Sequence, residues 1–541
     1  MSGLSLRVFR LLLVPALIGT IYLYFYPTFH QCTFPRDSTS GDQAPFRLLA
    51  LGDPQLEGDT SLPEHGHTEL FPSIQRILNS IQRSDLGAIS RDGGRLLYED
   101  IPKALRTYHK KLDLWGNDQY LAHMYRTVSR HTDPTHVVVL GDLLGSQWID
   151  DEEFGRRSNR FWGTVFSGAG KVPSDISDYK NVPAEELRGN KSWKNRIIAV
   201  AGNHDIGYAG DIDEKRIERF EDAFGRVNYD INFKLNGSTI IDKTTKKPLA
   251  PELRLIILNS MNLDSPAAHA QLQQDSIDHM NERLYWQIPQ TDTTGTILLT
   301  HIPLFKESGI CTDGPFFDYF PDRGPKDYFS NSIKEQNHLT YDVSARILEG
   351  VVGPSRTRSA IILNGHDHTG CDTYHSRSII EDIPEPPPPE VNPEEEDDED
   401  GTIAASKWNK PAPPPPEREK WLVQRYAESG KTRKNETLTG VREVTVRSMM
   451  GQFGGNAGLL SAWFNVEKKE WEFEYDTCAA GVQHIWWAIH VLDLIVVGMG
   501  VLGAVSAAVG GSGGSGTKSK NGTKTTKKKS SGKNKKNKQK Q

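Results

Sequence analysis

Over most of this sequence positive charge is too scarce to balance the acidic residues. The formal net charge is −6, but the eleven lysines after Gly510, where no acidic residue occurs, contribute +11 and leave −17 for the preceding residues. Nucleic-acid phosphates bind to positively charged surfaces, so this imbalance argues against a nucleic acid as the partner of the folded body. The lysine-rich end is typical of a solvated or lipid-facing tail.

Apolar residues are scarce between Glu381 and Glu419. It contains the runs PEPPPPEVNPEEEDDEDG and KPAPPPPERE, which are rich in proline and acidic residues. This composition cannot bury enough apolar surface to offset the entropy of ordering, which excludes a packed core there. We therefore expect a disordered, solvated insertion at 381–419, with loose cation binding as the alternative role.

Hydrophobic runs long enough to cross a membrane occur at two places. The first, Leu11 to Pro27, is uncharged, follows two arginines and ends in an aromatic cluster. It lacks a small-x-small cleavage site, which favours a signal anchor over the alternative, a cleaved signal peptide. The second, Ile485 to Val509, begins near two adjacent tryptophans, as is typical of a membrane interface, and is followed by the lysine-rich tail.

The flanking charges predict the orientation of the chain. Arginines precede the first span and lysines follow the second, so the positive-inside rule places residues 1–10 and 510–541 in the cytosol. The region between the spans would then lie in the lumen. Glycosylation acceptor triplets at Asn190, Asn236 and Asn435 are consistent with that location.

Cysteine is also scarce, with four residues in 541. In an oxidising lumen a pair of cysteines can form a disulfide. Cys311 and Cys371 each follow closely on a histidine motif, and we expect these two to be joined. No pairing is predicted for Cys32 and Cys478.

Apolar, β-branched runs recur between the two spans, and each ends in a turn with polar residues able to hold a metal. Such runs are typical of strands covered on both faces, and the helical stretch Asn117 to His131 fits a crossover connection. Ligands gather at the carboxyl ends of strands in α/β sheets, so the turns predict one site. The runs are Phe46–Gln55, His136–Asp142, Arg196–Asp205, Leu253–Ser260, Thr296–Pro303 and Ala360–His368; further strands are expected at Arg442–Met449 and in a hairpin at Ser461–Tyr475.

The polar turns form an ordered series. In chain order they read Asp53-Pro-Gln55, Gly141-Asp142, Gly202-Asn203-His204-Asp205, His301 and Gly365-His366-Asp367-His368. This series resembles the calcineurin-like metallophosphoesterase superfamily, whose pattern is D-x-H, G-D, G-N-H-[DE], H and G-H-x-H. The resemblance runs from about Phe46 to Met450. It implies an α/β fold, a four-layer αββα sandwich, for a lumenal domain over residues 46–480, with one transmembrane helix at each end.

The resemblance also implies two divalent metal ions. Two ions about 3.5–4 Å apart need oxygen and imidazole ligands from several strands, with a carboxylate to bridge them. The first ion would take Asp53, Asp142 as the bridge, and His368; the second would take Asp142, Asn203, His301 and His366. His366 and His368, one residue apart in an extended chain, would point to opposite sides and address different ions.

Two residues beside the ligands receive roles from the same resemblance. His204 would stabilise the transition state or protonate the leaving oxygen. Asp205 would orient His204 or accept hydrogen bonds from backbone amides, with helix N-capping as an equally ordinary role. The glycines before the ligands would let the backbone turn tightly, at Gly52, Gly141, Gly202 and Gly365.

Gln55 departs from the superfamily pattern, which has a histidine ligand to the first metal at this position. A glutamine oxygen is a harder ligand, so the site should favour Mn²⁺ or Mg²⁺ over Zn²⁺, and we expect Mn²⁺. How tightly the first metal is held stays open. The departure narrows the resemblance, because GDPQLEGD at Gly52 to Asp59 is similar to the membrane-bound eukaryotic enzymes that remodel glycosylphosphatidylinositol (GPI) anchors. LDLWGNDQYLAHMYR, GDLLGSQWIDDEEF and RSMMGQFGGNAGLL also look like that branch, especially its fungal members.

Resemblance to that branch implies a phosphodiesterase of the endoplasmic reticulum membrane. It would remove an ethanolamine-phosphate side branch from a mannose of the GPI glycan, a step linked to export of GPI-anchored proteins toward the Golgi. The expected partners are GPI-anchored proteins or the GPI lipid, and membrane lipids. We expect action on the second mannose, with the first as the alternative. The rival classes are a non-catalytic cargo or lipid receptor with a degenerate metal site, and a structural membrane protein.

Overall fold

The computed structural model of this chain describes residues 2–58, 71–177, 184–187, 191–235, 240–242, 245–286, 293–324, 329–353, 359–378, 420–435 and 437–511. The chain forms two compact units. The larger unit comprises residues 21–488, and the smaller unit comprises residues 1–20 together with residues 489–541. The insertion expected at 381–419 lies outside the described residues, and so does the expected lysine-rich tail beyond Gly511.

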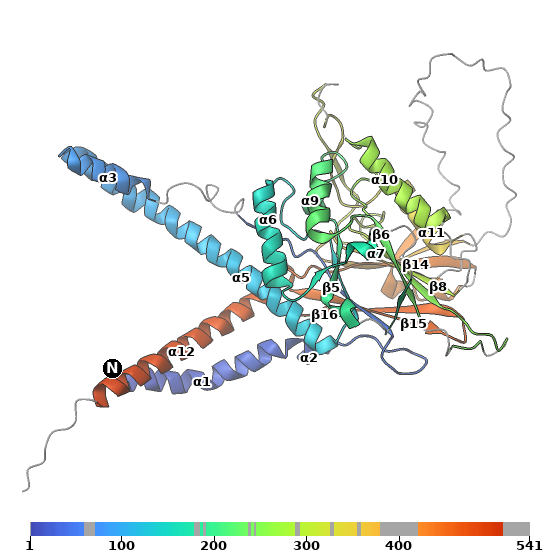
Figure 1. The fold of residues 1–541 in the computed structure, drawn as a ribbon, viewed down its shortest axis with the longest axis horizontal. Coiled ribbons are helices and arrows are strands. Elements are labelled where there is room, and N and C mark those ends of the chain that lie inside the picture. The colour runs from blue at the N-terminus through green and yellow to red at the C-terminus, as the bar shows by residue number, and fades with distance from the viewer. Residues whose placement is uncertain are drawn as a thin grey trace, which may run out of the picture. The chain divides into compact units, whose positions relative to one another are not determined.

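Two large β-sheets form the centre of the larger unit (Figure 1). The first has the strand order β16 (Glu470–Ala479), β15 (Asn456–Asn465), β1 (Phe46–Leu51), β2 (His136–Leu140), β5 (Arg196–Val200), β3 (Gly170–Lys171). The second has the order β13 (Leu422–Arg425), β12 (Cys371–Ser378), β14 (Leu438–Thr445), β11 (Ala360–Asn364), β8 (Thr294–Leu299), β7 (Glu252–Ile257), β6 (Tyr229–Lys234), β4 (Glu185–Glu186). A small antiparallel pair consists of β9 (Phe317–Tyr319) and β10 (Ile333–Gln336).

The middle strands of each sheet are parallel. β1, β2 and β5 run parallel in the first sheet, and β7, β8, β11 and β14 run parallel in the second. Antiparallel strands, β15 and β16 in one sheet and β12 and β13 in the other, extend them to one side. Each of the six apolar runs singled out in the sequence contains one of these parallel strands, so their polar turns follow carboxyl ends.

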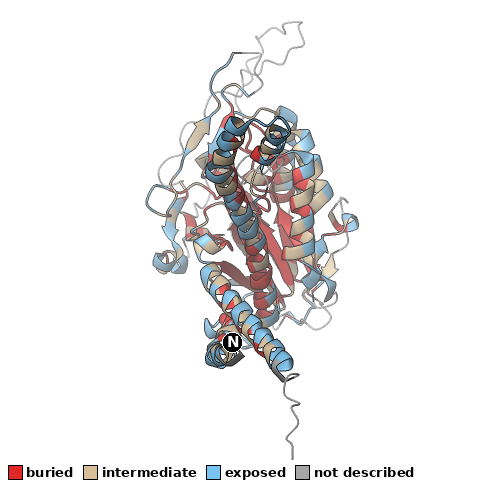
Figure 2. Ribbon diagram, turned by 90° about the vertical axis from the view of Figure 1, so that its left-hand side faces the viewer, coloured by how far each residue is buried: buried red, intermediate tan, exposed pale blue. Residues whose placement is uncertain are grey.

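The inner faces of the two sheets share one hydrophobic core. Because side chains alternate along a strand, Leu48 and Ala50 of β1 point into that core, where they join Val138 of β2. The second sheet contributes residues such as Ile257 and Leu299 to the same cluster. Figure 2 shows these strands as the buried centre of the molecule, with helices around them.

Helices cover the outer faces of the sheets (Figure 1). The first sheet is covered by α5 (Ile101–Thr132) and α6 (Asp151–Arg160), the second by α10 (Ala270–Asn281) and α11 (Tyr341–Val352). The layers are therefore helix, sheet, sheet and helix, which confirms the predicted four-layer αββα architecture. The predicted crossover helix at 117–131 is the inner half of α5, which begins sixteen residues earlier, at Ile101.

Two disulfides join distant parts of the larger unit. The expected bond between Cys311 and Cys371 is present and ties the segment after His301 to the first residue of β12. A second bond, which the sequence did not predict, joins Cys32 to Cys478 across a sequence separation of 446 residues.

The two candidate membrane spans are helices α1 (Ser2–Tyr24) and α12 (Gln483–Gly511). α1 begins and ends earlier than the run expected at 11–27. Its N-terminal part includes both arginines, and Pro27 belongs to a separate short helix, α2 (Tyr26–Phe29). Within the smaller unit, Thr20 Oγ1 on α1 donates a hydrogen bond to Asp493 Oδ2 on α12 at 3.0 Å. This bond gives the carboxylate inside the second candidate span a polar partner.

Candidate metal centre

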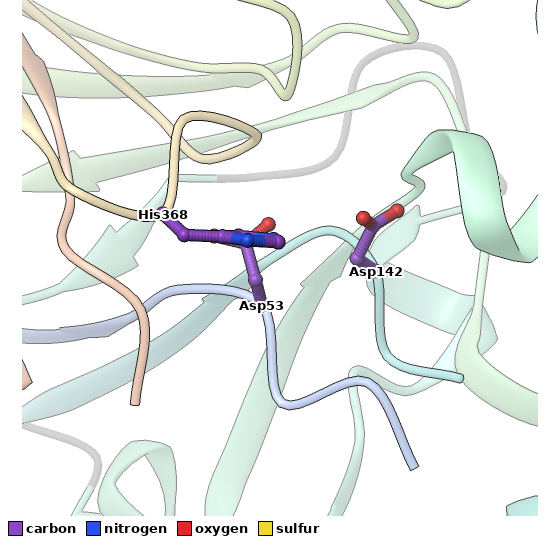
Figure 3. Close-up of side chains that lie close together, drawn as sticks. All are labelled: Asp53, Asp142 and His368. Atoms are coloured by element: carbon purple, nitrogen blue, oxygen red, sulfur yellow. The ribbon is translucent and has the colours of Figure 1, made fainter. Parts of the chain in front are cut away.

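Three potential metal ligands converge where strands of both sheets end. Asp53 follows β1, Asp142 follows β2 and His368 follows β11. One ligand atom from each of these side chains lies within 4.8 Å of the others (Figure 3). Asp53 and Asp142 are almost completely buried. Two carboxylates and an imidazole at this spacing match the donors expected for a first divalent ion.

A second group of donors lies next to the first. The side-chain oxygen of Asn203 is 3.1 Å from His301 Nε2 and 3.0 Å from His366 Nδ1. The two imidazole rings are 5.1 Å apart, centre to centre. The amide oxygen of Asn203 therefore lies close to one nitrogen of each imidazole, and all three residues belong to the ligand set predicted from the sequence for a second ion.

Asp142 lies between the two groups. Its Oδ1 is 3.4 Å from His301 Nε2, which belongs to the second group. Its Oδ2 accepts a hydrogen bond from Gln55 Nε2, which borders the first group, at 2.9 Å. Each carboxylate oxygen thus faces a different group, which is the arrangement needed for a ligand that bridges two ions.

Backbone carbonyls orient both histidines of the second group. Nδ1 of His301 lies 2.8 Å from the Leu140 carbonyl, and Nε2 of His366 lies 2.9 Å from the Gln336 carbonyl. Donation to these carbonyls leaves the other ring nitrogen, with its lone pair, facing Asn203. Burial lowers the pKa of His301 and lowers that of His366 to about 3. Burial therefore favours the neutral form of both imidazoles, which is the form that binds a metal.

The chemistry of the first group fits a cation. Asp53 Oδ2 is buried without a hydrogen-bond partner among the described residues. Burial and the neighbouring Asp142 raise the pKa of Asp53 well above its usual range. A divalent ion would supply the missing partner and compensate the clustered negative charge.

Gln55 borders the first group as a donor. Its Nε2 lies 2.9 Å from Asp142 Oδ2 and 3.2 Å from His368 Nε2. In this orientation the amide nitrogen, and not the oxygen, faces the other two side chains. Rotation of the amide by half a turn would present Oε1 to an ion held by Asp53, Asp142 and His368.

The backbone is strained at the site. Positive φ angles, which residues other than glycine rarely adopt, occur at Asp53 (46°), Gln55 (40°), Asp142 (49°) and His366 (75°). The explanation of the His-x-His spacing by an extended chain was therefore wrong, because His366 has a left-handed backbone. The two rings still face different groups, since His366 Nδ1 faces Asn203 whereas His368 Nε2 faces Gln55.

Glycines next to the ligands serve two purposes. Gly141 has a φ of +87°, which fits the expected tight turn. Gly365 has no such angle, but a Cβ there would lie 2.3 Å from the Leu140 carbonyl oxygen. At Gly365 glycine is thus required because the Leu140 backbone approaches closely, and not because of the turn.

His204 and Asp205 lie beside the ligands on the short helix α8 (Asn203–Ile206). The imidazole of His204 is 37% exposed, and its Nε2 lies 3.8 Å from Asp142 Oδ2, too far for a hydrogen bond. Asp205 is buried and accepts hydrogen bonds from the backbone amides of Gly202, Leu143 and Leu144. Of the roles considered for Asp205, the structure shows two: its bonds to backbone amides fix the segments around Asp142 and Asn203, and the bond from Gly202, the N-cap residue of α8, caps that helix.

Behind the site lies a buried ionic network that the sequence motifs did not reveal. Glu443 on β14 accepts hydrogen bonds from the ammonium of Lys306, the side chain of Asn364 and the backbone amide of Leu304. Lys306 and Glu443 are both fully buried. Burial alone would raise the pKa of Glu443, but Lys306 and His375 hold it well below its usual range. Glu443 thereby connects the segment after His301 with the residue two places before His366.

We expect Glu443→Ala to destabilise the protein. The substitution leaves the Lys306 ammonium buried without its carboxylate, which typically costs about 3–5 kcal/mol. Thermal unfolding of the detergent-purified protein should show a clearly lower Tm. Asp318→Ala is the matched control, because the Asp318–Lys334 pair has a 2.7 Å contact but is about half exposed and should contribute little. Equal Tm values for the two variants would contradict the importance of the network.

Comparison with known proteins agrees with this fold and site. Residues 46–370 match the family described as calcineurin-like phosphoesterase. The match covers more than half of the chain, and the chain belongs to this family. It is a metal-dependent phosphoesterase of the hydrolase class, with a candidate metal site at Asp53, Asp142 and His368.

Among known proteins, the chain is similar to Protein TED1 of Saccharomyces cerevisiae. The two are 27% identical over 530 residues, which cover 89% of this chain and 94% of TED1. It is also 27% identical to Metallophosphoesterase 1 of Xenopus laevis over 34% of this chain and 44% of that protein. Cell division control protein 1 of S. cerevisiae is 22% identical over 48% of this chain and 42% of its own length.

Proposed function

We propose that this protein is a binuclear phosphodiesterase of the endoplasmic reticulum membrane that removes an ethanolamine-phosphate branch from a mannose of the GPI glycan. The second mannose is the proposed position, and export of GPI-anchored proteins toward the Golgi is the proposed outcome. The observation that carries the chemistry is the convergence of two donor groups on either side of Asp142. The GPI substrate rests on the likeness of the stretches around Gln55, Asp142 and Ser448 to GPI-remodelling enzymes.

The donor set supports two metal positions. Asp53, Asp142 and His368, with Gln55 after rotation of its amide, would hold the first ion. Asp142, Asn203, His301 and His366 would hold the second. Bound ions of this kind supply an activated water and neutralise charge on the phosphoryl oxygens. Oxygen ligands predominate at the first position, which supports the proposal of Mn²⁺.

His204 is the proposed catalytic residue of this chain. Its side chain is more exposed than those of Asp53, Asp142, His301 and Asn203, and so can reach a substrate above the metal ligands. Its backbone amide donates to Asp142 Oδ1 at 2.9 Å, which fixes the start of α8 against the metal site. From this position the imidazole can hold a proton for the leaving sugar oxygen or donate a hydrogen bond to the phosphoryl group.

A lumenal catalytic domain with both termini in the cytosol is part of the proposal. Disulfides persist in oxidising compartments, and the larger unit contains two. The side chain of Asn435, one of the three glycosylation acceptors, is exposed, whereas Asn190 and Asn236 lie outside the described residues. A GPI lipid is confined to the membrane, so an anchored enzyme meets it at a raised effective concentration.

The GPI glycans of cells lacking this protein test the proposal. We expect mass spectrometry to show an additional ethanolamine phosphate on the second mannose, which the wild-type protein removes on re-expression and His204→Ala does not. Accumulation on the first mannose would select the alternative position. Unchanged glycans with slowed export of GPI-anchored proteins would favour the non-catalytic receptor and refute the enzyme.

A further inference from the structure

A helical arm projects from the larger unit. It comprises α3 (Pro72–Gln82), α4 (Leu86–Arg95) and the outer half of α5, up to Gly116 (Figure 1). The backbone amide of Ser73 donates to the Asp100 carboxylate at 2.8 Å, which fixes the start of α3 beside the start of α5. Figure 2 shows that α5 changes from buried at its inner end to exposed along the arm.

The arm exposes apolar side chains in rows. On α5, Leu105, Tyr108, Leu112 and Trp115 are each 54–65% exposed. Their spacing of three, four and three residues places them on one face of the helix. The same spacing recurs in α3 and its N-cap residue Phe71, where Phe71, Ile74, Leu78 and Ile81 are 36–54% exposed. Two apolar rows on one arm are more than scattered surface residues, and they mark a surface that binds a membrane or a protein.

The row on α5 is continuous with the start of a candidate membrane span. Trp487, in the first turns of α12, packs so closely on Gly116 that a Cβ there would lie 1.8 Å from its indole. Its ring also lies 6.3 Å from that of Trp115, the last member of the row. Tryptophans at the start of a span sit at the level of the lipid headgroups. The row therefore begins at the depth where the membrane surface is expected.

The inner half of α5 contacts the end of the other candidate span. His123 packs edge-on against Tyr24, at a ring distance of 4.9 Å, and His131 Nε2 lies 2.9 Å from the Tyr24 carbonyl. Within the larger unit, α5 thus contacts Tyr24 and Trp487, which lie near the two chain ends of that unit, in the two candidate spans. A helix rises by about 1.5 Å per residue, so an arm that starts there can extend along the membrane surface.

The charge of the arm fits the surface of a membrane. Residues 71–116 contain eight lysines and arginines and five acidic residues, whereas the chain before the tail carries −17. Lys103, Arg106 and Lys110 lie on the face of α5 opposite the apolar row. Basic residues on the polar face of an amphipathic helix are typical of helices that lie in the interface of a bilayer with anionic lipids. The apolar row on α5 ends beside Trp487, which favours a membrane over a soluble protein as the partner of the row.

From these observations we infer that the arm of residues 71–116 lies on the membrane crossed by α12, with its apolar rows in the headgroup region. The inference rests on α12 being a span and is independent of the catalytic proposal. The bilayer then orients the larger unit through a third contact besides the two spans. Rotation of the metal centre relative to a membrane-bound substrate would be restricted accordingly.

Nitroxide labelling of the full-length protein in vesicles tests this inference. All four native cysteines are in disulfides, so an introduced cysteine is the one free thiol. Labels at Leu105→Cys and Leu112→Cys should collide several-fold more often with oxygen, relative to nickel-EDDA, than labels at the matched controls Arg106→Cys and Asp113→Cys. Vesicles of phosphatidylcholine that contain about 20% phosphatidylserine supply the anionic surface.

The outcomes separate the occupants of the rows. A high oxygen preference limited to the apolar positions supports burial in lipid. Equal access to nickel-EDDA at Leu112 and Arg106 would show that the arm lies in water and overturn the inference. Exclusion of both reagents at Leu112 would show that a protein covers the row, which overturns it too.

Discussion

Asp142→Ala should abolish phosphoesterase activity and remove bound metal from both positions. The two oxygens of Asp142 face different donor groups, so loss of the carboxylate would deprive each of the two proposed ions of a ligand and remove the charge between them. We expect hydrolysis of a generic phosphodiester in manganese to fall by at least about 10³-fold. Metal analysis of the purified, folded protein should show that both ions are lost.

Gln55→Ala is the matched control for that experiment. Gln55 borders only the first group, through Asp142 Oδ2 and His368 Nε2. Its loss should weaken the first metal by about 10- to 100-fold and leave the second in place. If changing Gln55 removed both ions equally, or if Asp142→Ala retained one at full occupancy, the assignment of Asp142 as the bridge would be wrong.

His204→Ala should leave metal binding intact and still lower kcat. The imidazole of His204 faces neither donor group within hydrogen-bonding distance, but it is accessible to substrate. Loss of a general acid or of a donor to the phosphoryl group typically lowers the rate by about 10²–10⁴-fold. The measurement is steady-state hydrolysis together with the metal content of the same preparation.

The choice of leaving group distinguishes the two roles of His204. A nitrophenolate leaves without a proton, whereas a sugar alkoxide needs one. If His204 protonates the leaving oxygen, the variant should lose far less activity on a nitrophenyl diester than on an alkyl diester. If it stabilises the phosphoryl group, both losses should be similar. Full activity on both substrates would exclude a catalytic role.

The strands and the candidate ligands could be predicted because their signals are local. Each apolar run ends in a turn within about ten residues, so residues such as Asp142 and His301 are recognisable where they stand. The roles of backbone partners could not be predicted in this way. Gln336 lies in no motif, yet its carbonyl orients His366, and only the fold places the two together.

Apart from the Cys311–Cys371 disulfide, long-range pairings of side chains were beyond the reach of sequence patterns. Glu443 looked like one polar residue in an ordinary strand, and its partner Lys306 is 137 positions away. The start of α5 at Ile101 was missed because the outer half of that helix buries few side chains and exposes both charged and apolar residues.

The Cys32–Cys478 bond turns the polypeptide between these residues into a closed covalent ring, from which the two terminal helices leave as tails. A single proteolytic cut anywhere in the ring opens it without releasing a fragment. Both tails, and every residue of the metal centre, stay on one covalently connected molecule after such a cut. Attachment of the catalytic body to both terminal helices is therefore insensitive to one nick as long as the disulfide is intact.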